Sequence, residues 1–281
     1  MNREFQEFES TGKCPTCGSE TVETAFEPDI GRCANCRVYF RSPRPTQNEI
    51  ARSYDTGETF TAWQREEPAR AKMWERRATL VRRFRSGGKL LDIGTGDGRF
   101  LRAARTHGYQ VTGTELSAEG ASYARKDGFD IRLGQVMDIE LPRENFDIIT
   151  IWHVLEHVPN PGELLHRMHA LLKPGGILIV AVPNEENYFV RRALHLPVRS
   201  SPFAPLVFGG EIHLTYFQPA TLRTTLRIAE FELLEFGVDD LYSVRDTKMK
   251  LRLSLQRLLA RVTQWHFAVA MYAVCQRKPA L

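Results

Sequence analysis

The sequence predicts an α/β fold, in which a doubly wound parallel sheet is preceded by a small cysteine-rich module. Three observations lead to this prediction. Residues 90–98 have the pattern of a strand that ends in a glycine-rich turn before a helix. Strand-like and helix-like segments then alternate regularly, as in a parallel sheet covered by helices on both faces. Two Cys-x-x-Cys pairs stand in the first forty residues, ahead of that alternation.

The glycine-rich turn indicates a nucleotide-type pocket. Gly94, Gly96 and Gly98 stand at alternate positions in the stretch Leu-Leu-Asp-Ile-Gly-Thr-Gly-Asp-Gly. Because glycine has no Cβ, the backbone can turn sharply there and a flat ligand can lie against it. The next expected strand, residues 110–114, ends at Glu115, the place where an acid meets ribose hydroxyls in a doubly wound sheet.

An acid inside the turn argues against a dinucleotide. A dinucleotide-binding turn normally reads Gly-x-Gly-x-x-Gly and places a pyrophosphate at the N-terminus of the helix. Here Asp97 lies within the turn, and its carboxylate repels phosphate. We therefore expect an adenosine-type ligand that has a cationic centre and no phosphate.

The segments after the turn have the patterns of the expected elements. Residues 146–152 form a nearly continuous apolar, β-branched run, which is typical of a central parallel strand buried on both faces. Ser117 is a suitable N-cap, and Pro219 is a suitable first helical residue. We expect helices over residues 117–126, 162–173 and 219–229, and strands over residues 130–133, 177–182, 231–237 and 265–275.

The overall composition bounds the class of protein. The chain has 281 residues and a formal net charge of +4, which is too small to demand a polyanionic partner. It contains no apolar run of about 18 residues, so we expect no membrane span. The first residues have no apolar signal core, and we therefore expect a cytoplasmic protein. In that compartment, cysteines paired by spacing are metal ligands more often than disulfides.

The two cysteine pairs predict a zinc ribbon over residues 1–45. Cys14 and Cys17 are separated by fifteen residues from Cys33 and Cys36, and a hairpin between the pairs would close a tetrahedral site. Independent redox dithiols are the weaker interpretation. Four cysteine ligands leave no position for water, so we expect Zn²⁺ to be structural and not catalytic.

Residues 46–86 are expected to form a helical linker or cap. The prolines in residues 38–45 suggest an extended linker before it. Residues 63–85 have the pattern of a basic helix, which we interpret as a solvated face covering the sheet edge and the cofactor, with a site for RNA or an acidic substrate as the alternative. Three aromatic residues either line the acceptor pocket or belong to the core: Tyr54, Trp63 and Trp74.

At this point the chain resembles the class I S-adenosylmethionine-dependent methyltransferases. The resemblance covers roughly residues 70–281 and rests on motifs in the order of that family. They are Leu-Asp-Ile-Gly-Thr-Gly-Asp-Gly, the acid Glu115, Gln-Val-Met-Asp at 135–138, Phe-Asp-Ile-Ile-Thr-Ile-Trp-His-Val-Leu-Glu-His-Val at 146–158, and Leu-Lys-Pro-Gly-Gly at 172–176.

The resemblance implies a seven-stranded Rossmann-like sheet over residues 87–281, with an antiparallel pair of strands at its edge. It also implies a site for S-adenosylmethionine. Asp92 and the turn would hold the methionine end, Glu115 the ribose, and the residues after the third strand the adenine. The implied cofactor-binding residues are Asp92, Gly94, Thr95, Gly96, Glu115, Leu116, Met137, Asp138, Trp152 and His153.

The run His153-Val-Leu-Glu156-His157 has two interpretations. In isolation, His-x-x-Glu-His is a metalloprotease pattern. That interpretation needs a sustained helix, whereas here a buried strand precedes the run and Val-Pro-Asn-Pro ends it. By the resemblance, these residues form one wall of the cleft, and Glu156 and His157 are either structural or face the acceptor.

Residues 184–215 are expected to insert a lid over the acceptor. The aromatic residues Tyr188, Phe189, Phe203 and Phe208 suggest a pocket that is at least partly apolar. If residues 211–217 are extended, Glu211 and His213 share a face, and a carboxylate beside an imidazole suits a general base.

The stretch around His213 resembles Glu-His-x-x-Tyr-Phe of sugar C-methyltransferases, which also carry an N-terminal zinc module, although Ile212 separates the acid from the histidine here. The alternative is that His213 only caps the following helix.

These patterns together predict methyl transfer from S-adenosylmethionine to a small-molecule acceptor of the sugar or secondary-metabolite type. The alternatives are an RNA methyltransferase that uses the ribbon and basic helices, and a non-catalytic cofactor-binding domain. The basic, leucine-containing segment 248–261 either contacts a membrane or partner or packs on the domain. The sequence specifies neither the acceptor atom nor the oligomeric state.

Overall fold

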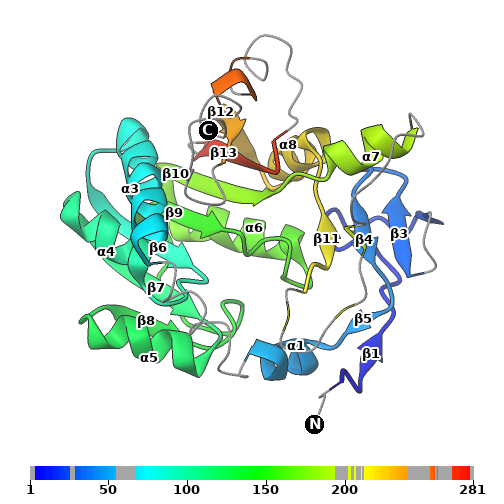
Figure 1. Cartoon of the computed structure of the whole chain (residues 1–281), viewed down its shortest axis with the longest axis horizontal. Helices are drawn as coiled ribbons and strands as arrows, with labels where there is room; N and C mark the ends of the chain where they lie inside the picture. The colour runs from blue at the N-terminus through cyan, green and yellow to red at the C-terminus, as the bar shows by residue number, and fades with distance from the viewer. Residues whose placement is uncertain are drawn as a thin grey trace.

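The computed structural model describes residues 4–25, 29–54, 67–193, 202–203, 206, 210, 212–239, 254–256, 258 and 268–278. In Figure 1 the strands of the main sheet cross the centre of the molecule, and strands from the N-terminal region form a separate group beside it. Within the described part of the chain no helix is both long enough and apolar enough to cross a lipid bilayer.

The main sheet has the expected α/β architecture. Its seven strands lie in the order β12-β13-β10-β9-β6-β7-β8. All neighbours in β10-β9-β6-β7-β8 are parallel, and β13 is antiparallel to both β10 and β12. The sheet predictions are confirmed, including the antiparallel pair at the edge. The strands are β6 (Gly88–Ile93), β7 (Tyr109–Glu115), β8 (Asp130–Leu133), β9 (Phe146–Trp152), β10 (Leu172–Pro183), β12 (Phe231–Val238) and β13 (Ala270–Arg277).

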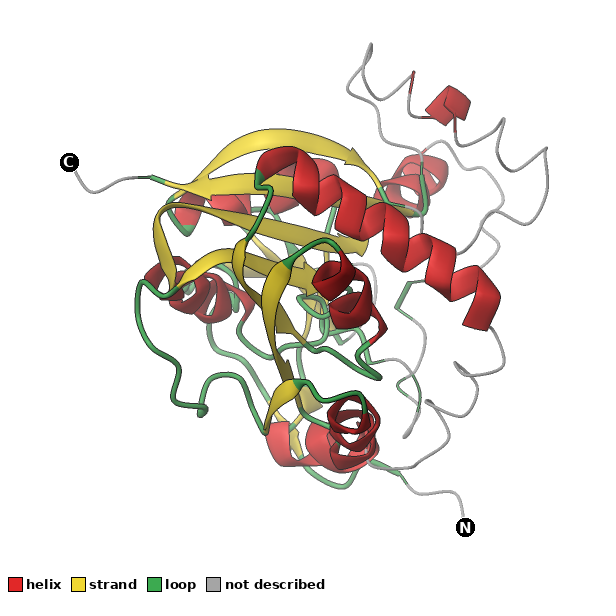
Figure 2. Cartoon of the chain, turned by 90° about the vertical axis from the view of Figure 1, so that its left-hand side faces the viewer, coloured by secondary structure: helices red, strands yellow, loops and turns green. Residues whose placement is uncertain are grey.

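Helices cover both faces of this sheet, and the alternation of strand side chains separates two cores (Figure 2). One core joins Leu90 and Ile148 to α3, α4 and α5. The other joins Leu91 and Ile149 to α6 and α8. The helices are α3 (Glu67–Phe84), α4 (Arg99–Thr106), α5 (Ala118–Lys126), α6 (Pro161–Leu171) and α8 (Pro219–Ile228).

The N-terminal region forms a four-stranded sheet in the order β11-β4-β3-β2. Its first three strands in the chain are β2 (Val22–Thr24), β3 (Ile30–Cys33) and β4 (Tyr39–Arg41). The fourth strand, β11 (Thr215–Tyr216), comes from the C-terminal part of the chain. β1 (Phe8–Glu9) pairs with β5 (Arg44–Pro45), ahead of the short helix α1 (Gln47–Tyr54). The interpretation of residues 38–45 as a linker was wrong, because these residues supply β4 and β5.

The cysteine-rich region shares its core with the main sheet. Cys14, Cys33 and Phe40 belong to the same buried cluster as the α6 and α8 side chains. The backbones of the two regions are also hydrogen-bonded, since the Gly162 N–H on α6 donates to the Pro15 carbonyl at 3.2 Å. The ribbon is therefore built against one face of the sheet.

The inserted segment after β10 packs on the ribbon. It begins with α7 (Glu186–Ala193), and the Phe189 ring stacks on Tyr39 of β4 with centroids 4.4 Å apart. Tyr188 and Phe203 are each 8% exposed and join the same aromatic cluster. These rings attach the insertion to β4, and their expected role as the lining of an acceptor pocket stays a prediction. Phe208 lies outside the described residues.

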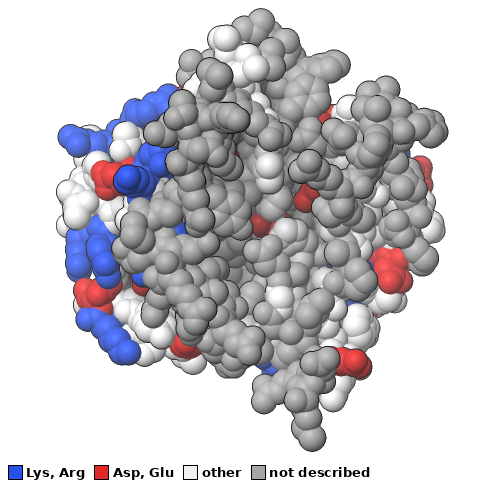
Figure 3. All heavy atoms as spheres, in the orientation of Figure 1, with Lys and Arg blue, Asp and Glu red and all other residues white. Residues whose placement is uncertain are grey.

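Arginines of the basic helix α3, together with Arg85 directly after it, form ion pairs within the molecule. Arg70 pairs with Asp97, Arg77 with Asp239, Arg83 with Glu235 and Arg85 with Asp147. Lys and Arg side chains gather on the side of the molecule where Figure 1 places α3, α4 and α5, with acidic side chains among them (Figure 3). The expected helix in residues 248–261 falls largely outside the described residues.

Replacing Gly162 by alanine is expected to weaken the contact between the ribbon and α6. The added Cβ would lie 2.2 Å from the Thr16 carbonyl oxygen. Overpacking typically costs about 1–3 kcal/mol, so urea denaturation should show a loss of that size in the free energy of unfolding. Gly87→Ala is the matched control, since its Cβ meets nothing within 4 Å. Equal stability of the two variants would contradict the tight backbone contact.

Candidate cofactor and acceptor site

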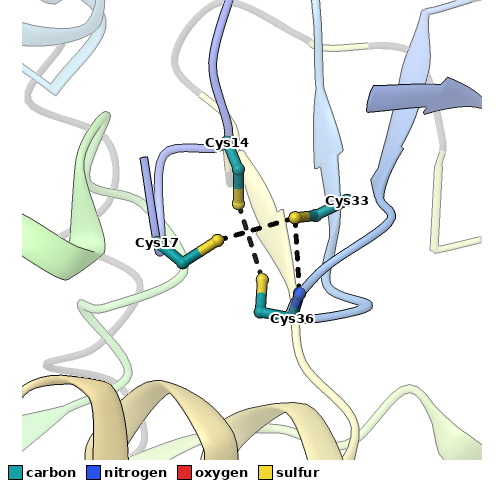
Figure 4. A group of neighbouring side chains, drawn as sticks. All are labelled: Cys14, Cys17, Cys33 and Cys36. Carbon is teal, nitrogen blue, oxygen red and sulfur yellow. Dashed lines mark hydrogen bonds between the residues drawn. The ribbon is translucent and has the colours of Figure 1, made fainter. Parts of the chain in front are cut away.

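The four predicted cysteine ligands converge on one point (Figure 4). The Sγ atoms of Cys14 and Cys36 are 3.5 Å apart, and those of Cys17 and Cys33 are 3.6 Å apart. All four lie within 4.8 Å of one another. A tetrahedral zinc ion with Zn–S distances of about 2.3 Å would separate its sulfurs by roughly 3.8 Å. The positions of the four sulfurs are therefore compatible with a tetrahedral metal ion.

Two tight turns orient these thiols toward one another. The Gly18 N–H donates to the Cys14 carbonyl, and the Arg37 N–H donates to the Cys33 carbonyl. Each of these turns ends in a residue with positive φ, +71° at Gly18 and +67° at Arg37. The backbone thus reverses after each pair and brings both of its sulfurs to the same side.

The glycine-rich turn follows β6 and surrounds a buried carboxylate. Asp92 is 2% exposed, and it accepts from the hydroxyls of Thr150 at 2.6 Å and Thr95 at 3.0 Å. Burial raises the pKa of Asp92 to about 7, even though these two hydrogen bonds favour the charged form. Gly94 has a φ of +69°, and a Cβ there would lie 2.4 Å from Val154, so glycine is required at this position.

Glu115 ties the end of β7 to the turn. Its carboxylate accepts from the Gly96 N–H at 2.6 Å and from the Ser117 N–H at 2.9 Å. Burial raises the pKa of Glu115, and the backbone hydrogen bonds act in the opposite direction. The predicted methionine-end and ribose residues therefore lie side by side at the carboxyl edge of the sheet.

Asp97 has a different role from the one expected from the sequence. Its carboxylate accepts from Arg99 Nε at 2.7 Å and is paired with Arg70 at 3.4 Å. Two guanidinium groups therefore neutralise the acid on which the argument against phosphate rested. The carboxylates of Asp92 and Glu115 supply the negative charge of the cleft instead.

The predicted adenine residues lie after β8, beside the end of β7. The Gly134 N–H donates to the Glu115 carbonyl at 2.9 Å, which fixes the start of the loop that carries Met137 and Asp138. Met137 is 38% exposed, Asp138 is exposed and Leu116 is half-buried. These residues share the correct edge of the sheet, and their contact with a cofactor stays a prediction.

A buried ion pair that the sequence did not reveal supports Trp152 and His153. Asp239, which follows β12, accepts from Arg77 at 2.5 Å and 3.2 Å and lies 2.8 Å from His153 Nε2. The Arg77 guanidinium also lies over the rings of Trp74 and Trp152, at 4.7 and 4.8 Å from their centroids. Trp74, a residue of α3, therefore packs against the buried core that contains Trp152.

Burial alone would raise the pKa of Asp239, but Arg77 and His153 hold it below its usual range. Burial would lower the pKa of His153, and the carboxylates of Asp239 and Glu156 more than offset this effect and raise it. His153 also adopts a φ of +54°, in the left-handed region that side chains rarely enter.

His213 meets the Glu156-His157 pair, which comes from a distant part of the chain. The His157 and His213 ring centroids are 4.9 Å apart, and the three side chains each offer a ligand atom within 4.8 Å of the others. Tyr54 contacts the His157 ring edge-on, with the centroids 6.4 Å apart. The sequence alone did not connect Glu156 and His157 to His213.

Two details correct the expectations about His213. The N-cap of α8 is Gln218, with a reciprocal hydrogen bond between Gln218 and Thr221, so His213 does not cap this helix. Glu211, its expected acidic partner, lies outside the described residues, as does Trp63. Among the described residues, Glu156 is the carboxylate that lies with His213 in this cluster. Glu185 is a second acid in this region. Burial and the charge of Glu156 raise the pKa of Glu185 to about 7.

Several buried polar atoms in this region lack a hydrogen-bond partner within the described part of the chain. They are Trp74 Nε1, Trp152 Nε1, His153 Nδ1 and Glu156 Oε2. Buried polar groups are usually satisfied. Trp152, His153 and Glu156 lie at or just after the carboxyl end of β9, so their unsatisfied atoms are available to a polar ligand there. The residues present fit an adenosine-type cofactor with an amino acid end.

Residues 63–235, more than half of the chain, match the family model described as a methyltransferase domain. The fold and the strand-end carboxylates agree with that match. The chain belongs to this family of methyltransferase domains, and its fold is that of the class I S-adenosylmethionine-dependent methyltransferases.

Curated relatives match a part of the chain. It is 36% identical over 123 residues to a ubiquinone biosynthesis O-methyltransferase of Coxiella burnetii, a match that covers 42% of this chain and 50% of that protein. It is 33% identical over 156 residues to the ubiquinone biosynthesis O-methyltransferase of Xanthomonas oryzae pv. oryzae, with 53% of this chain and 64% of that protein covered. The chain thus spans less than two thirds of the length of these relatives.

Solved structures show the same fold at low sequence identity. One is the complex between the Haloferax volcanii Trm112 methyltransferase activator and a methyltransferase, with a TM-score of 0.56, 19% identity, and 80% of this chain and 98% of that chain covered. Another is a Thermotoga maritima S-adenosylmethionine-dependent methyltransferase described as a possible histamine N-methyltransferase, with a TM-score of 0.55, 18% identity, and 82% and 100% covered.

The raised pKa of Asp92 predicts pH-dependent cofactor binding. An acid is charged above its pKa, so the carboxylate that is predicted to attract the cofactor's ammonium group forms as pH rises through about 7. One pKa unit is worth about 1.4 kcal/mol, and we expect affinity for S-adenosylhomocysteine to increase roughly tenfold between pH 6 and pH 8 by calorimetry. Asp92→Asn should bind weakly with no such rise; a rise of equal size in the variant would assign it to another group.

Proposed function

We propose that the chain transfers the methyl group of S-adenosylmethionine to a hydroxyl oxygen of a small-molecule acceptor, of the sugar or secondary-metabolite type. The observation that carries this proposal is the meeting of Glu156, His157 and His213 next to the cofactor strand β9. Three side chains that can accept a proton or hold a cation suit an acceptor whose proton must be lost. The ubiquinone biosynthesis O-methyltransferases among the relatives support an oxygen acceptor.

In this proposal, residues at the ends of successive strands bind different parts of the cofactor. Asp92 with Gly94, Thr95 and Gly96 binds the methionine end, and Glu115 with Leu116 binds the ribose. The remaining proposed contacts are Met137 and Asp138 to the adenine, and Trp152 and His153 along the wall of the cleft. When bound, S-adenosylmethionine supplies a methyl group already activated by its sulfonium.

The chain's own residues align the acceptor and exclude water. In-line displacement needs the nucleophile held close to the methyl carbon on the side opposite the sulfur, and such positioning is itself a large part of the rate enhancement. The Arg77 guanidinium lies over the indole rings of Trp74 and Trp152, and in this proposal the two rings shield this line from water. The acceptor cluster, comprising Glu156, His157 and His213, then stabilises the acceptor in its deprotonated form.

The cysteine cluster is proposed to bind a structural Zn²⁺. The sulfur distances of 3.5 and 3.6 Å support this proposal. A site with four thiolates has no open position for a substrate, so its role is to hold the ribbon strands. We retain the predicted division of the chain into a ribbon (1–45), a helical cap (46–86) and a methyltransferase domain (87–281) with an insertion (184–215) as part of this proposal.

An RNA acceptor is less well supported by the charges on α3. An RNA-binding helix presents arginines to phosphates, and the resulting affinity falls steeply with salt. Here Arg70, Arg77, Arg83 and Arg85 are each paired with an acid of the same chain. A non-catalytic binding domain would bind the cofactor without turnover, which the assays below distinguish.

His213→Ala is expected to lower kcat at least 100-fold, because loss of a general base typically costs about 10²–10⁴ in rate. The affinity for S-adenosylhomocysteine should stay within twofold, since His213 is not assigned to the cofactor. Single-turnover methylation and calorimetry measure the two effects separately. His166→Ala, on the exposed face of α6, is the matched control, and full activity of His213→Ala would remove this residue from the mechanism.

The acceptor class is tested by incubating the enzyme with labelled S-adenosylmethionine and a panel of sugars, phenols, amines and short RNA. We expect label in the hydroxyl-bearing small molecules, and mass spectrometry should locate it on oxygen. Glu115→Ala should abolish the transfer through loss of cofactor affinity, whereas replacement of the exposed Glu232 of β12 by alanine should not. Transfer to RNA alone, or to no member of any class, would reject the proposed function.

A further inference from the structure

We propose that the acceptor cluster binds a divalent metal ion, distinct from the cysteine site, and that the acceptor's hydroxyl oxygen completes the coordination of this ion. The second part rests on the proposed function, and the first does not. Glu156, His157 and His213 each provide one ligand atom, and these atoms lie within 4.8 Å of one another. Two imidazoles and one carboxylate on one side of an ion leave its other positions open, as in other catalytic metal sites.

The hydrogen bond made by His157 fixes which of its nitrogens carries a lone pair. His157 Nδ1 lies 2.7 Å from the carbonyl oxygen of Ile212, and a carbonyl can only accept, so Nδ1 carries the proton. In the neutral ring Nε2 then has the lone pair. Metal-binding histidines commonly donate their second N–H to a backbone carbonyl in this way.

That lone pair faces a carboxylate across a gap. His157 Nε2 is 3.7 Å from Glu156 Oε1, which is longer than a hydrogen bond. Two electron-rich atoms at this separation repel each other unless a cation lies between them. A metal ion about 2.0–2.2 Å from each nitrogen and oxygen would occupy this gap.

Glu156 has a further unmet requirement. It is 2% exposed, and its Oε2 has no hydrogen-bond partner among the described residues. A buried carboxylate needs a compensating charge. His153 Nδ1 lies 3.6 Å from Oε1, but the other nitrogen of that ring already contacts Asp239 at 2.8 Å. The counter-charge from His153 is therefore shared with a second acid, and the cluster retains room for a cation.

The backbone holds the two halves of the cluster together. The N–H groups of Leu214 and Thr215 both donate to the Glu156 carbonyl, at 2.8 and 3.1 Å. With the bond from His157 to Ile212, three hydrogen bonds join residues 156–157 to residues 212–215. The ligands are thus positioned before any ion binds, which a specific metal site requires.

A cation here would make the acceptor's hydroxyl acidic. A divalent ion acts as a Lewis acid and lowers the pKa of an oxygen bound to it. In this arrangement His213 serves as a ligand in place of a general base, and the hydroxyl proton passes to solvent water. The resulting oxyanion forms the new carbon–oxygen bond, and the carbon–sulfur bond of the sulfonium breaks to leave a neutral thioether. No oxidant or reductant is consumed.

The test uses Mn²⁺ as the probe, because four thiolates select softer ions such as zinc, whereas carboxylate and imidazole ligands accept manganese. The 281-residue chain with zinc in the cysteine site is titrated with Mn²⁺ by calorimetry and by electron paramagnetic resonance. We expect one Mn²⁺ per chain with the zinc retained. Glu156→Gln and His213→Ala should each weaken Mn²⁺ binding at least tenfold, and His166→Ala should leave it unchanged.

The outcomes separate this proposal from the proposed function. Absence of Mn²⁺ binding to the wild-type enzyme, or unchanged binding in both variants, overturns the metal site. The wild-type titration decides even if Glu156→Gln fails to fold. Methyl transfer to a hydroxyl that continues undiminished after a chelator has removed all metal except the cysteine-bound zinc overturns the metal's role and leaves the proposed function standing. Binding of Mn²⁺ by these residues without transfer to any hydroxyl acceptor overturns the proposed function instead.

Discussion

The pairing of β11 with β4 is the interaction on which the rest of the site depends. Thr215 and Tyr216 pair with Phe40 and Tyr39, so a strand from beyond the insertion completes the sheet of the cysteine ribbon. The same short segment donates two backbone hydrogen bonds to the Glu156 carbonyl. Ribbon, insertion and the end of β9 are therefore held by one extended stretch, and His213 stands immediately before it. The ribbon thus acts as part of the scaffold that places the acceptor cluster.

A second long-range constraint holds the opposite wall of the cleft. Arg77 of α3 and Asp239 after β12 form a buried pair whose side chains are each 5% exposed, and His153 joins it from the end of β9. Burying such a pair costs desolvation, but removing one partner costs more, because the other charge is left uncompensated. The pair fixes a helix to two strand ends and sandwiches Arg77 between two indole rings. Its contribution is to the geometry of the wall more than to net stability.

The sequence predicted the features set by local chemistry. The β9 run, the Ser117 N-cap, which accepts from the Gly120 N–H at 3.3 Å, and the glycine-rich turn all depend on residues close together in the chain. The four cysteines were recognisable because metal ligands impose a fixed spacing.

By contrast, the aromatic packing of the insertion on β4 and the meeting of His213 with Glu156 depend on tertiary contacts between distant segments. Asp97 shows the limit within a single motif. Its carboxylate is neutralised by Arg99, two residues later in the chain, and by Arg70, 27 residues earlier, and the sequence position of Arg70 does not reveal this contact.

The preference for a cationic donor over a pyrophosphate rests on hydrogen-bond occupancy as well as charge. A dinucleotide places its phosphates on the free N–H groups of the turn after the first strand. Here the Gly96 N–H is already taken by the Glu115 carboxylate at 2.6 Å. A phosphate would have to displace that acid and then lie beside it and beside Asp92, both of which lack a direct arginine or lysine pair in the described part of the chain. A sulfonium with an ammonium group meets the same two carboxylates with favourable sign, so the turn selects its ligand through Glu115 and not through the neutralised Asp97.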